Sequence, residues 1–295
     1  MSTAKLHVSL HVNKDGTTTE HDLLSPEIQR WATDAYGEYS TDESSHEITA
    51  TEVKRTFHQC SNTSGPDGVT AQMIDNANRQ CMTECLYHLW NEVWRSGVVP
   101  RSWKLEHRIL LPKPGKENYN ECSSYGTISI TDILGKWFEK IVSTRLVCHL
   151  ENKGFDECQF AYLKKRSATQ AILSLAEQIK RNKDNGNLTG VLFFDFTDAF
   201  GSVNRAKTKL IQKLRQDFGI TGRLFLYLIS FLSGRQACIK VNTLLGEWIY
   251  SVYGTSAGTV LGAILFLTYV HGTPDCIKYR FADDLATIAV DNDAH

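Results

Sequence analysis

Apolar residues recur every three or four positions along several long segments, which is the pattern of a helix with one buried face. Residues 71–96 have this spacing and stop at a glycine, so we expect one long amphipathic helix there. Residues 168–183 predict another helix, with Leu173, Ala176 and Ile179 on its buried face. Further helices are expected at 49–57, 130–151, 205–216, 222–233 and 259–270, the last of them buried.

Shorter apolar runs predict strands. Residues 190–196 (GVLFFDF) are almost continuously apolar, which is typical of a strand buried on both faces. Helices mixed with paired strands indicate the α+β class. The other expected strands are a short one at 108–111, a hairpin of 236–242 and 247–253 around Gly246, and two strands within 277–290 folded over Asp283-Asp284.

Length and composition bound the fold and the location. A chain of 295 residues with 42% hydrophobic residues predicts one large domain or two interlocked lobes with a sizeable core. Its longest apolar stretch, residues 259–270, is shorter than the roughly 20 residues that cross a bilayer, so we expect no membrane partner. The first residues do not resemble a secretory signal. We therefore expect an intracellular protein of the nucleus or cytoplasm that is not secreted.

Charge is unevenly distributed although the total is −1. Residues 1–60 carry 5 basic and 10 acidic side chains, a net of −5, and residues 100–185 carry 15 and 10, a net of +5. A basic centre can hold a phosphate backbone, although a mixed-charge solvated surface gives the same arithmetic. Residues 1–48 are otherwise polar and acidic, and we expect a partly disordered leader there.

Cysteine spacing gives one weak candidate for a metal site. There is no Cys-x-x-Cys, but Cys81, Cys85 and His88 have the spacing of one helix face. That face also carries Leu89 and Trp90, so helix packing is the preferred interpretation.

Three aspartates have the placement of a metal site. Asp283 and Asp284 are adjacent at an expected hairpin tip, where they repel each other without cations, and Asp195 ends an apolar strand. If the two strands are neighbours, the three carboxylates converge, and their oxygens suit a pair of Mg²⁺ ions. The alternative is an exposed turn and a helix cap.

The order of several motifs resembles the reverse transcriptase of non-LTR, LINE-type retrotransposons. Residues 194–200 (FDFTDAF), 254–266 (GTSAGTVLGAILF) and 281–284 (FADD) are similar to motifs A, B and C of its palm. Upstream, residues 64–68 (SGPDG), 111–116 (LPKPGK), 133–141 (ILGKWFEKI) and 159–167 (QFAYLKKRS) fall where the family has finger motifs. The resemblance covers about residues 49–290.

The resemblance implies a fold and a reaction. It implies a leader at 1–48, fingers at 49–190 and a palm at 191–295 with a ferredoxin-like antiparallel sheet and packed helices, part of 205–250 packing with the fingers and the thumb absent. The implied activity is RNA-directed DNA polymerisation on an RNA template and a DNA primer with deoxynucleoside triphosphates. Two Mg²⁺ ions, or Mn²⁺ as a substitute, are the implied cofactors.

Individual roles are implied position by position. Asp195, Asp283 and Asp284 match the catalytic metal ligands, with the Phe196 carbonyl nearby. Phe200 matches the bulky residue that excludes a 2′-hydroxyl, with a plain core aromatic as the alternative. The residues that match template or substrate positions are Lys113, Lys116 and Arg166, where surface charge is the alternative, and Gly254 and Gly258, which let the motif B backbone approach the template.

The chain also departs from the family pattern. Where the family has a second aspartate in motif A, this chain has Gly201. Leu163 stands where the family has a basic residue of the fingers, and Ala257 stands where motif B has a glutamine. These departures favour a polymerase of low activity. One alternative is a catalytically decayed RNA-binding or structural remnant of the same fold. Another is a group II intron maturase-like protein, which is not supported because we find no maturase segment after the palm.

Overall fold

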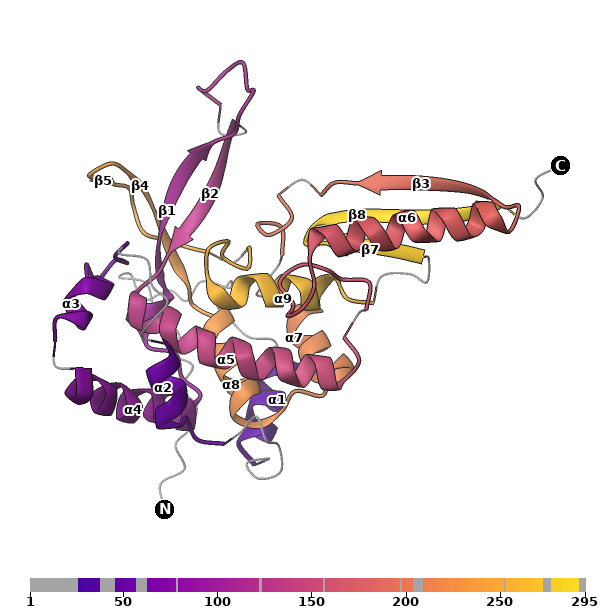
Figure 1. The fold of residues 1–295 in the computed structure, drawn as a ribbon. Coiled ribbons are helices and arrows are strands. Elements are labelled where there is room, and N and C mark those ends of the chain that lie inside the picture. Colours follow the sequence, from indigo (N-terminus) through magenta and orange to yellow (C-terminus); the bar gives the residue numbers. More distant parts are fainter. Residues whose placement is uncertain are drawn as a thin grey trace.

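The computed structural model describes residues 26–37, 46–56, 63–77, 79–121, 124–155, 157–196, 198–203, 209–251, 253–272 and 277–291. A body of helices carries two separate β-assemblies, one built on a long hairpin and one lying beside a single helix (Figure 1). The helices are α1 (Pro26–Gly37), α2 (Ala50–Thr56), α3 (Ala71–Asp75), α4 (Arg79–Ser96), α5 (Ile133–Asn152), α6 (Ala168–Asp184), α7 (Lys209–Gln212, continued by a π turn Lys213–Asp217), α8 (Gly222–Leu232) and α9 (Val260–Val270).

Most of the expected helices are confirmed, with two differences. The expected single helix at 71–96 is two helices, because the chain leaves the helical path after Asp75 and re-enters it at Arg79. Helix α1 was not predicted and lies inside the expected leader, with Ile28, Ala32 and Ala35 buried. It packs against α8. The rest of residues 1–45 lies outside the described residues.

The core of the helical body is aromatic. Trp90, Trp94, Trp137, Phe138 and Tyr227 are all at most 1% exposed. The rings of Phe138 and Tyr227 meet edge to face with centroids 5.2 Å apart, a geometry that aromatic pairs favour. These side chains come from α4, α5 and α8, so one cluster joins the three helices.

A capping box begins α2, the helix expected at 49–57. The Thr49 hydroxyl accepts a hydrogen bond from the Glu52 amide at 3.2 Å, and the Glu52 carboxylate accepts one from the Thr49 amide at 2.8 Å. Two otherwise unpaired donors of the first turn are satisfied in this way.

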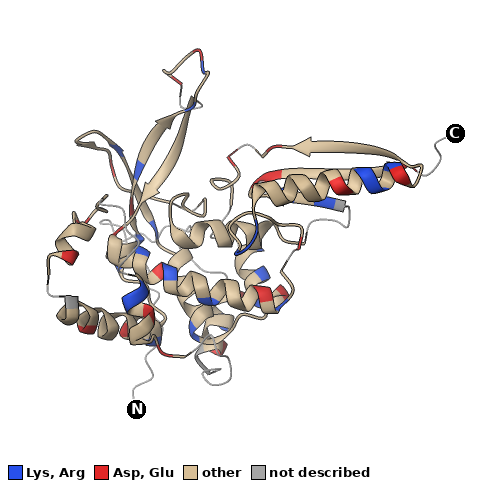
Figure 2. Cartoon of the chain, in the orientation of Figure 1, with Lys and Arg blue, Asp and Glu red and all other residues tan. Residues whose placement is uncertain are grey.

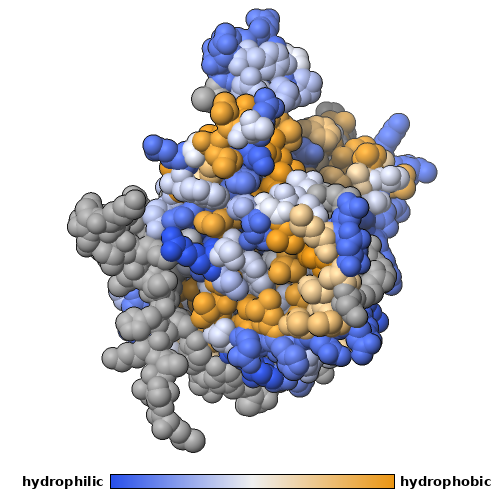
Figure 3. Space-filling view, turned by 90° about the vertical axis from the view of Figure 1, so that its left-hand side faces the viewer, coloured by the Kyte–Doolittle hydropathy of each residue, from blue (hydrophilic) through white to orange (hydrophobic). Residues whose placement is uncertain are grey.

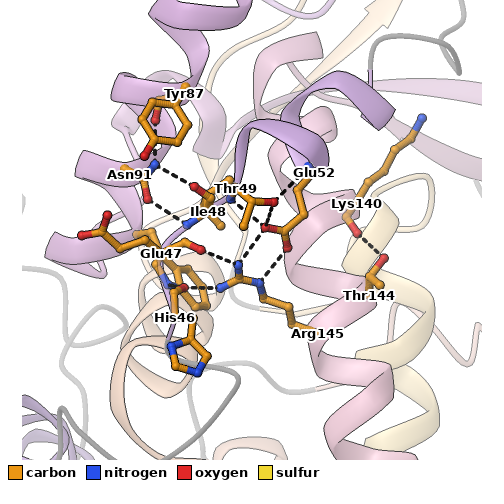
Figure 4. A network of polar contacts seen from close by, with 11 residues as sticks. His46, Glu47, Ile48, Thr49, Glu52, Tyr87, Asn91, Lys140, Thr144 and Arg145 are labelled. Carbon is orange, nitrogen blue, oxygen red and sulfur yellow. Dashed lines mark hydrogen bonds and ion pairs between the residues drawn. The ribbon is translucent and has the colours of Figure 1, made fainter.

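Arg145 on α5 fastens this segment to the core (Figure 4). Its guanidinium donates to both carboxylate oxygens of Glu52, at 3.1 and 3.0 Å, and lies 5.0 Å from the Trp94 ring centre. Burial raises the pKa of Glu52, but the hydrogen bond from Arg145 opposes it and the net effect is a lowered pKa. Asn91 on α4 adds a pair of hydrogen bonds to the backbone of Ile48.

The first sheet has the strand order β2-β1-β4-β5, with β6 also paired to β4. Strands β1 (Leu105–Pro112) and β2 (Tyr125–Ile130) form an antiparallel hairpin, and β4 (Gln236–Val241) joins β1 in parallel. Strand β2 was not predicted. The short strands β5 (Leu244–Leu245) and β6 (Ile249–Tyr250) confirm the expected hairpin, but its turn is at Asn242, which has a positive φ of 55°, and not at Gly246.

The second sheet is antiparallel and has the order β3-β8-β7. Its strands are β3 (Leu188–Phe194), β7 (Ile277–Phe281) and β8 (Asp284–Asp291). Helix α6 packs against β3 and β7. The sheet therefore has the two strands over Asp283-Asp284 that the sequence predicts, and β3 is their neighbour.

Two expectations about burial in this region are wrong. Strand β3 is not buried, since Leu192 is 60% and Phe193 75% exposed. It is an edge strand, and α6 covers only part of the sheet. On α6 the predicted face is also wrong, because Leu173 is 62% exposed whereas Ala171 and Leu175 face the sheet in a shared cavity.

Surface properties follow the two assemblies. Basic and acidic residues are interleaved along α5 and α6, so these helices do not present a single basic face (Figure 2). The side that carries β4 and β5 has hydrophobic areas below a hydrophilic hairpin tip (Figure 3). Leu244 and Leu245 of β5 are 73% and 56% exposed. No helix in the described part of the chain combines the length and the apolar character that crossing a membrane requires.

The cysteine face of α4 is solvent-exposed, so packing does not explain it. Cys81, Cys85 and His88 are exposed, whereas Trp90 is buried on the other side of the helix. Among the described residues, no three His, Cys, Asp or Glu side chains could hold a metal ion together, those of Cys81, Cys85 and His88 included.

Candidate active site

Strand pairing brings the three aspartates to one end of the second sheet. Asp195 directly follows β3, Asp284 begins β8, and Asp283 lies in the two-residue turn between β7 and β8. Phe194 pairs with Leu285, so the next position along β3 places Asp195 beside Asp284. The neighbourhood of the two strands, on which the sequence argument depended, is confirmed.

Two cavities meet at Asp284. Asp195 and Asp284 line a cavity of about 420 Å³ between α6 and the sheet. Asp283 and Asp284 line another of about 330 Å³ together with Phe196. Asp195 and Asp284 are exposed and Asp283 is half-buried, so all three carboxylates can be reached from solvent.

The three carboxylates suit a hard cation, although they do not lie close enough together to hold one jointly. Within the described residues none of the three carboxylates forms an ion pair or a side-chain hydrogen bond, so each retains its capacity to bind a cation. Carboxylate oxygens are the ligands that Mg²⁺ prefers. However, no three such side chains in the described part are close enough to hold an ion together. Binding would have to draw them closer.

Phe200 lies where both of its interpretations apply. Its ring stacks on Phe266 of α9 with centroids 4.4 Å apart, as a core aromatic would. It also lines a cavity of about 250 Å³ with Gly254, Ser256 and Ala257. The structure thus places the expected sugar-contacting residue and the expected motif B loop around one hollow.

The two motif B glycines contact protein backbone closely. Gly254 has a φ of +86°, and its amide donates to the Val203 carbonyl at 2.7 Å. Gly258 has a φ of +104°, and a Cβ there would lie 2.5 Å from the Ser129 carbonyl oxygen. Only glycine fits these positions. Approach to a template strand stays a prediction, because the contacts seen are with residues 200–203 and β2.

The side chain of Asp198 occupies the space beside Gly201 in the motif A turn. A Cβ at Gly201 would lie 2.2 Å from Oδ2 of Asp198, so the Asp198 carboxylate covers the position. Asp198 has a positive φ of 49° and lines the same cavity as Phe200. An acidic group therefore remains in this turn, contributed by a different residue.

Lys113 and Lys116 lie apart from the aspartates. Both are exposed in the loop at the free end of the β1–β2 hairpin, which extends away from the helical body (Figure 1). Neither lines one of the cavities described above. Their expected contact with template or triphosphate stays a prediction.

Arg166 contacts its own segment of the chain. Its guanidinium donates to the carbonyl oxygens of Glu157 at 3.0 Å and Gln159 at 2.6 Å. Leu163, where the sequence comparison expects a basic residue, is only 7% exposed and belongs to the core. A basic side chain at that position would begin among core residues in this conformation.

Comparison with known proteins agrees with this geometry. The reverse transcriptase (RNA-dependent DNA polymerase) family matches residues 111–295, which is more than half of the chain. The chain belongs to the reverse transcriptase family. Its matched part includes all three aspartates, Phe200 and the motif B loop.

The relatives of this reverse transcriptase are polymerases of mobile elements. It is 29% identical over 206 residues to the probable RNA-directed DNA polymerase from transposon X-element of Drosophila melanogaster, covering 67% of this chain and 22% of the relative. The corresponding protein of transposon BS is 26% identical over 208 residues, with 69% and 22% covered. The mobile element jockey polymerase is 24% identical over 212 residues, with 68% and 23% covered. The domain is thus of the non-LTR, LINE type, and it spans about a fifth of the length of these relatives.

Two residues of this reverse transcriptase domain were not singled out from the sequence. Tyr162 lies edge-on to Phe200 at 6.4 Å, and burial together with the charge of Asp283 raises its pKa. Arg108 lines the Phe200 cavity and donates to Ser251 at 2.5 Å. Tyr162 stood inside a quoted motif, whereas Arg108 lies in a strand outside every quoted motif and pairs there with Glu106 at 2.9 Å.

Proposed function

We propose that the chain carries out RNA-directed DNA synthesis, extending a DNA primer on an RNA template with deoxynucleoside triphosphates. One observation carries this proposal above all. The pairing of β3 with β8 puts Asp195 beside Asp284, while the next turn supplies Asp283. Carboxylates that converge from a strand end and a hairpin turn are an arrangement suited to two-metal phosphoryl transfer.

Asp195, Asp283 and Asp284, with the carbonyl of Phe196, are the groups that would hold two Mg²⁺ ions, or Mn²⁺ in their place. Such ions, when bound, supply activation of the primer 3′-hydroxyl and charge neutralisation of the triphosphate. Within the described residues, none of these carboxylates is in an ion pair with a Lys, Arg or His side chain, so their negative charge is available to the ions. It also contributes a turn whose backbone fixes two of the carboxylates to a sheet end.

The surrounding residues would select and orient the substrates. Phe200, lining its cavity beside Gly254, would occupy the space that a 2′-hydroxyl requires. Gly258 would keep the motif B loop close to β2. Lys113 and Lys116 on the exposed hairpin loop would contact the template phosphates. Arg166 would act near the triphosphate through the segment that it holds.

A primer-extension assay on an RNA template, in Mg²⁺ and in Mn²⁺, tests the proposal. Asp283→Asn should abolish extension, because it removes a proposed metal ligand. The variant should unfold at the same temperature as the unmodified chain, because Asp283 is a half-buried turn residue outside the core. Asp291→Asn, at the exposed far end of β8, is the matched control and should extend normally. Undiminished extension by Asp283→Asn would show that the two-metal assignment is wrong.

A catalytically decayed RNA-binding remnant is the second candidate. It is supported by the buried Leu163, by the small Ala257 and by carboxylates that are not gathered into a set of three. This function predicts RNA binding by filter retention with no nucleotide addition in either metal. Binding and extension measured on the same preparation separate the two candidates.

A further inference from the structure

The turn that carries Asp283 has a backbone that needs external support. Phe281 pairs with Asp284, leaving Ala282 and Asp283 as the whole turn. Ala282 has a φ of +59° and is 8% exposed. A left-handed alanine is strained, and such residues persist where surrounding contacts over-determine the conformation.

The support comes from the buried side chain of Gln159, which lies 123 residues earlier in the sequence. Gln159 is 1% exposed. Its Oε1 accepts hydrogen bonds from the amide of Ala282 at 3.2 Å and from that of Ala161 at 3.0 Å. One side-chain oxygen therefore joins the finger segment to the left-handed residue of the turn.

Backbone pairing places Gln159 at this position. The Arg280 amide donates to the Cys158 carbonyl at 2.9 Å, and the Phe160 amide donates to the Arg280 carbonyl at 2.8 Å. These two bonds make a parallel bridge between Gln159 and Arg280, beside the last residues of β7. Arg166 holds the same segment from its other side through the Gln159 carbonyl.

The same segment then reaches the proposed reaction centre. Three residues after Gln159, the ring of Tyr162 lies edge-on to that of Phe200, with centroids 6.4 Å apart. A segment fixed by Gln159 and Arg166 thus contacts the metal-binding turn and the sugar-contacting ring together.

We propose that Gln159 is a positioning residue, which holds the Ala282–Asp283 turn so that Asp283 presents its carboxylate beside Asp284 and Asp195. This inference rests on the proposed function for its consequence in catalysis. The holding contact itself can be measured without metal or substrate. It acts through backbone geometry, since Gln159 contacts the amide of Ala282 and not the carboxylates.

Amide hydrogen exchange of the metal-free 295-residue chain tests the contact. Gln159→Met keeps a long unbranched side chain but has no oxygen acceptor, so exchange at the Ala282 amide should rise about tenfold, with β3 and the far half of β8 unchanged. Gln159→Glu retains an acceptor oxygen and should keep the protection. Gln178→Met on α6, a glutamine that bonds Asn182 instead, is the matched control and should leave Ala282 unaffected.

Metal affinity and the rate of nucleotide addition provide the second test. In Gln159→Met, Mn²⁺ affinity measured by electron paramagnetic resonance and the kcat of single-nucleotide addition should each fall about tenfold, while KM for the nucleotide stays constant. If methionine does not fold, Gln159→Asn withdraws the oxygen by one methylene and gives the same readouts. An unchanged Ala282 exchange rate in the folded variant, or a rate that rises equally throughout the sheet, overturns the inference. An unmodified chain that binds no Mn²⁺ overturns the proposed function instead, and the exchange rates still decide the role of Gln159.

Discussion

The buried carboxylate of Glu139 on α5 accepts a hydrogen bond from the amide of Val260, the first residue of α9, at 2.9 Å. It accepts a second from Leu261 at 3.2 Å, and Glu139 is only 2% exposed. Burial raises its pKa, which the charge of Arg235 and these amides partly offset. Glu139 thereby anchors the helix that directly follows the Gly254–Gly258 loop, and so connects the core to the cavity at Phe200.

Glu139→Ala should lower the free energy of unfolding by about 2–4 kcal/mol, because it leaves buried amides without an acceptor. Urea unfolding followed by circular dichroism measures the change. Glu177→Ala is the matched control: its ion pair with Arg181 is exposed on both sides and should cost less than about 0.5 kcal/mol. Equal effects of the two substitutions would contradict an anchoring role for Glu139.

The helices were predictable because their signals are local. The expected helices at 168–183 and 259–270 agree with α6 and α9 within a residue at each end, and Ser167 and Thr259 cap them with their side chains. The apolar run of β3 misled the prediction of burial, since sequence does not say whether a strand has a neighbour on both sides or lies at an edge. Strand β2 depends on its partner β1 and has no strong pattern of its own.

The candidate site was predictable as residues but not as contacts. Aspartates at a strand end and a hairpin tip indicated chemistry, and their order along the chain indicated the family. The support of Ala282 by Gln159 and of α9 by Glu139 crosses more than a hundred residues, so no local pattern encodes either contact. The burial of Leu163 is likewise a tertiary property, and a motif comparison alone would have made it a surface position.

Phe200→Ala should raise the incorporation of ribonucleotides relative to deoxyribonucleotides by about tenfold or more, because removing the ring opens space for a 2′-hydroxyl. Competitive single-nucleotide addition measures the ratio. Since Phe200 also stacks on Phe266, stability will fall in the same variant. Phe266→Leu removes the stacking from the core side and should cost stability without altering the ratio. A ratio that changes equally in both variants would favour the core-aromatic interpretation of Phe200.

Asp132 should make stability depend on pH. It is 1% exposed, and burial, with the charge of Asp67 nearby, raises its pKa from 3.8 to about 7. Because the folded chain binds this proton more tightly, its stabilising contribution is complete below about pH 4 and is lost as pH rises to about 7. Asp132→Asn, which mimics the protonated form, should match the unmodified chain at pH 4 and exceed it by about 4 kcal/mol at pH 8.

Urea unfolding at both pH values measures this difference. A constant difference between Asp132→Asn and the unmodified chain across the range would show that Asp132 does not titrate on unfolding.

Ala257 and Leu163 both depart from the family pattern, but restoring the family's residue should have opposite effects at the two positions. Ala257 is half-buried and lines the cavity at Phe200, while its backbone carbonyl, which accepts from Ser129 at 2.7 Å, is unaffected by a longer side chain. Ala257→Gln should therefore fold normally and raise single-nucleotide addition about tenfold, through one added polar contact to the nucleotide.

Leu163→Arg would bury a guanidinium at a core position and should lower stability by about 3–5 kcal/mol without any gain in addition. Thermal unfolding and addition rates measured together check both outcomes. A stable, faster Leu163→Arg variant would mean that the 159–167 segment turns this residue toward the substrate during the reaction.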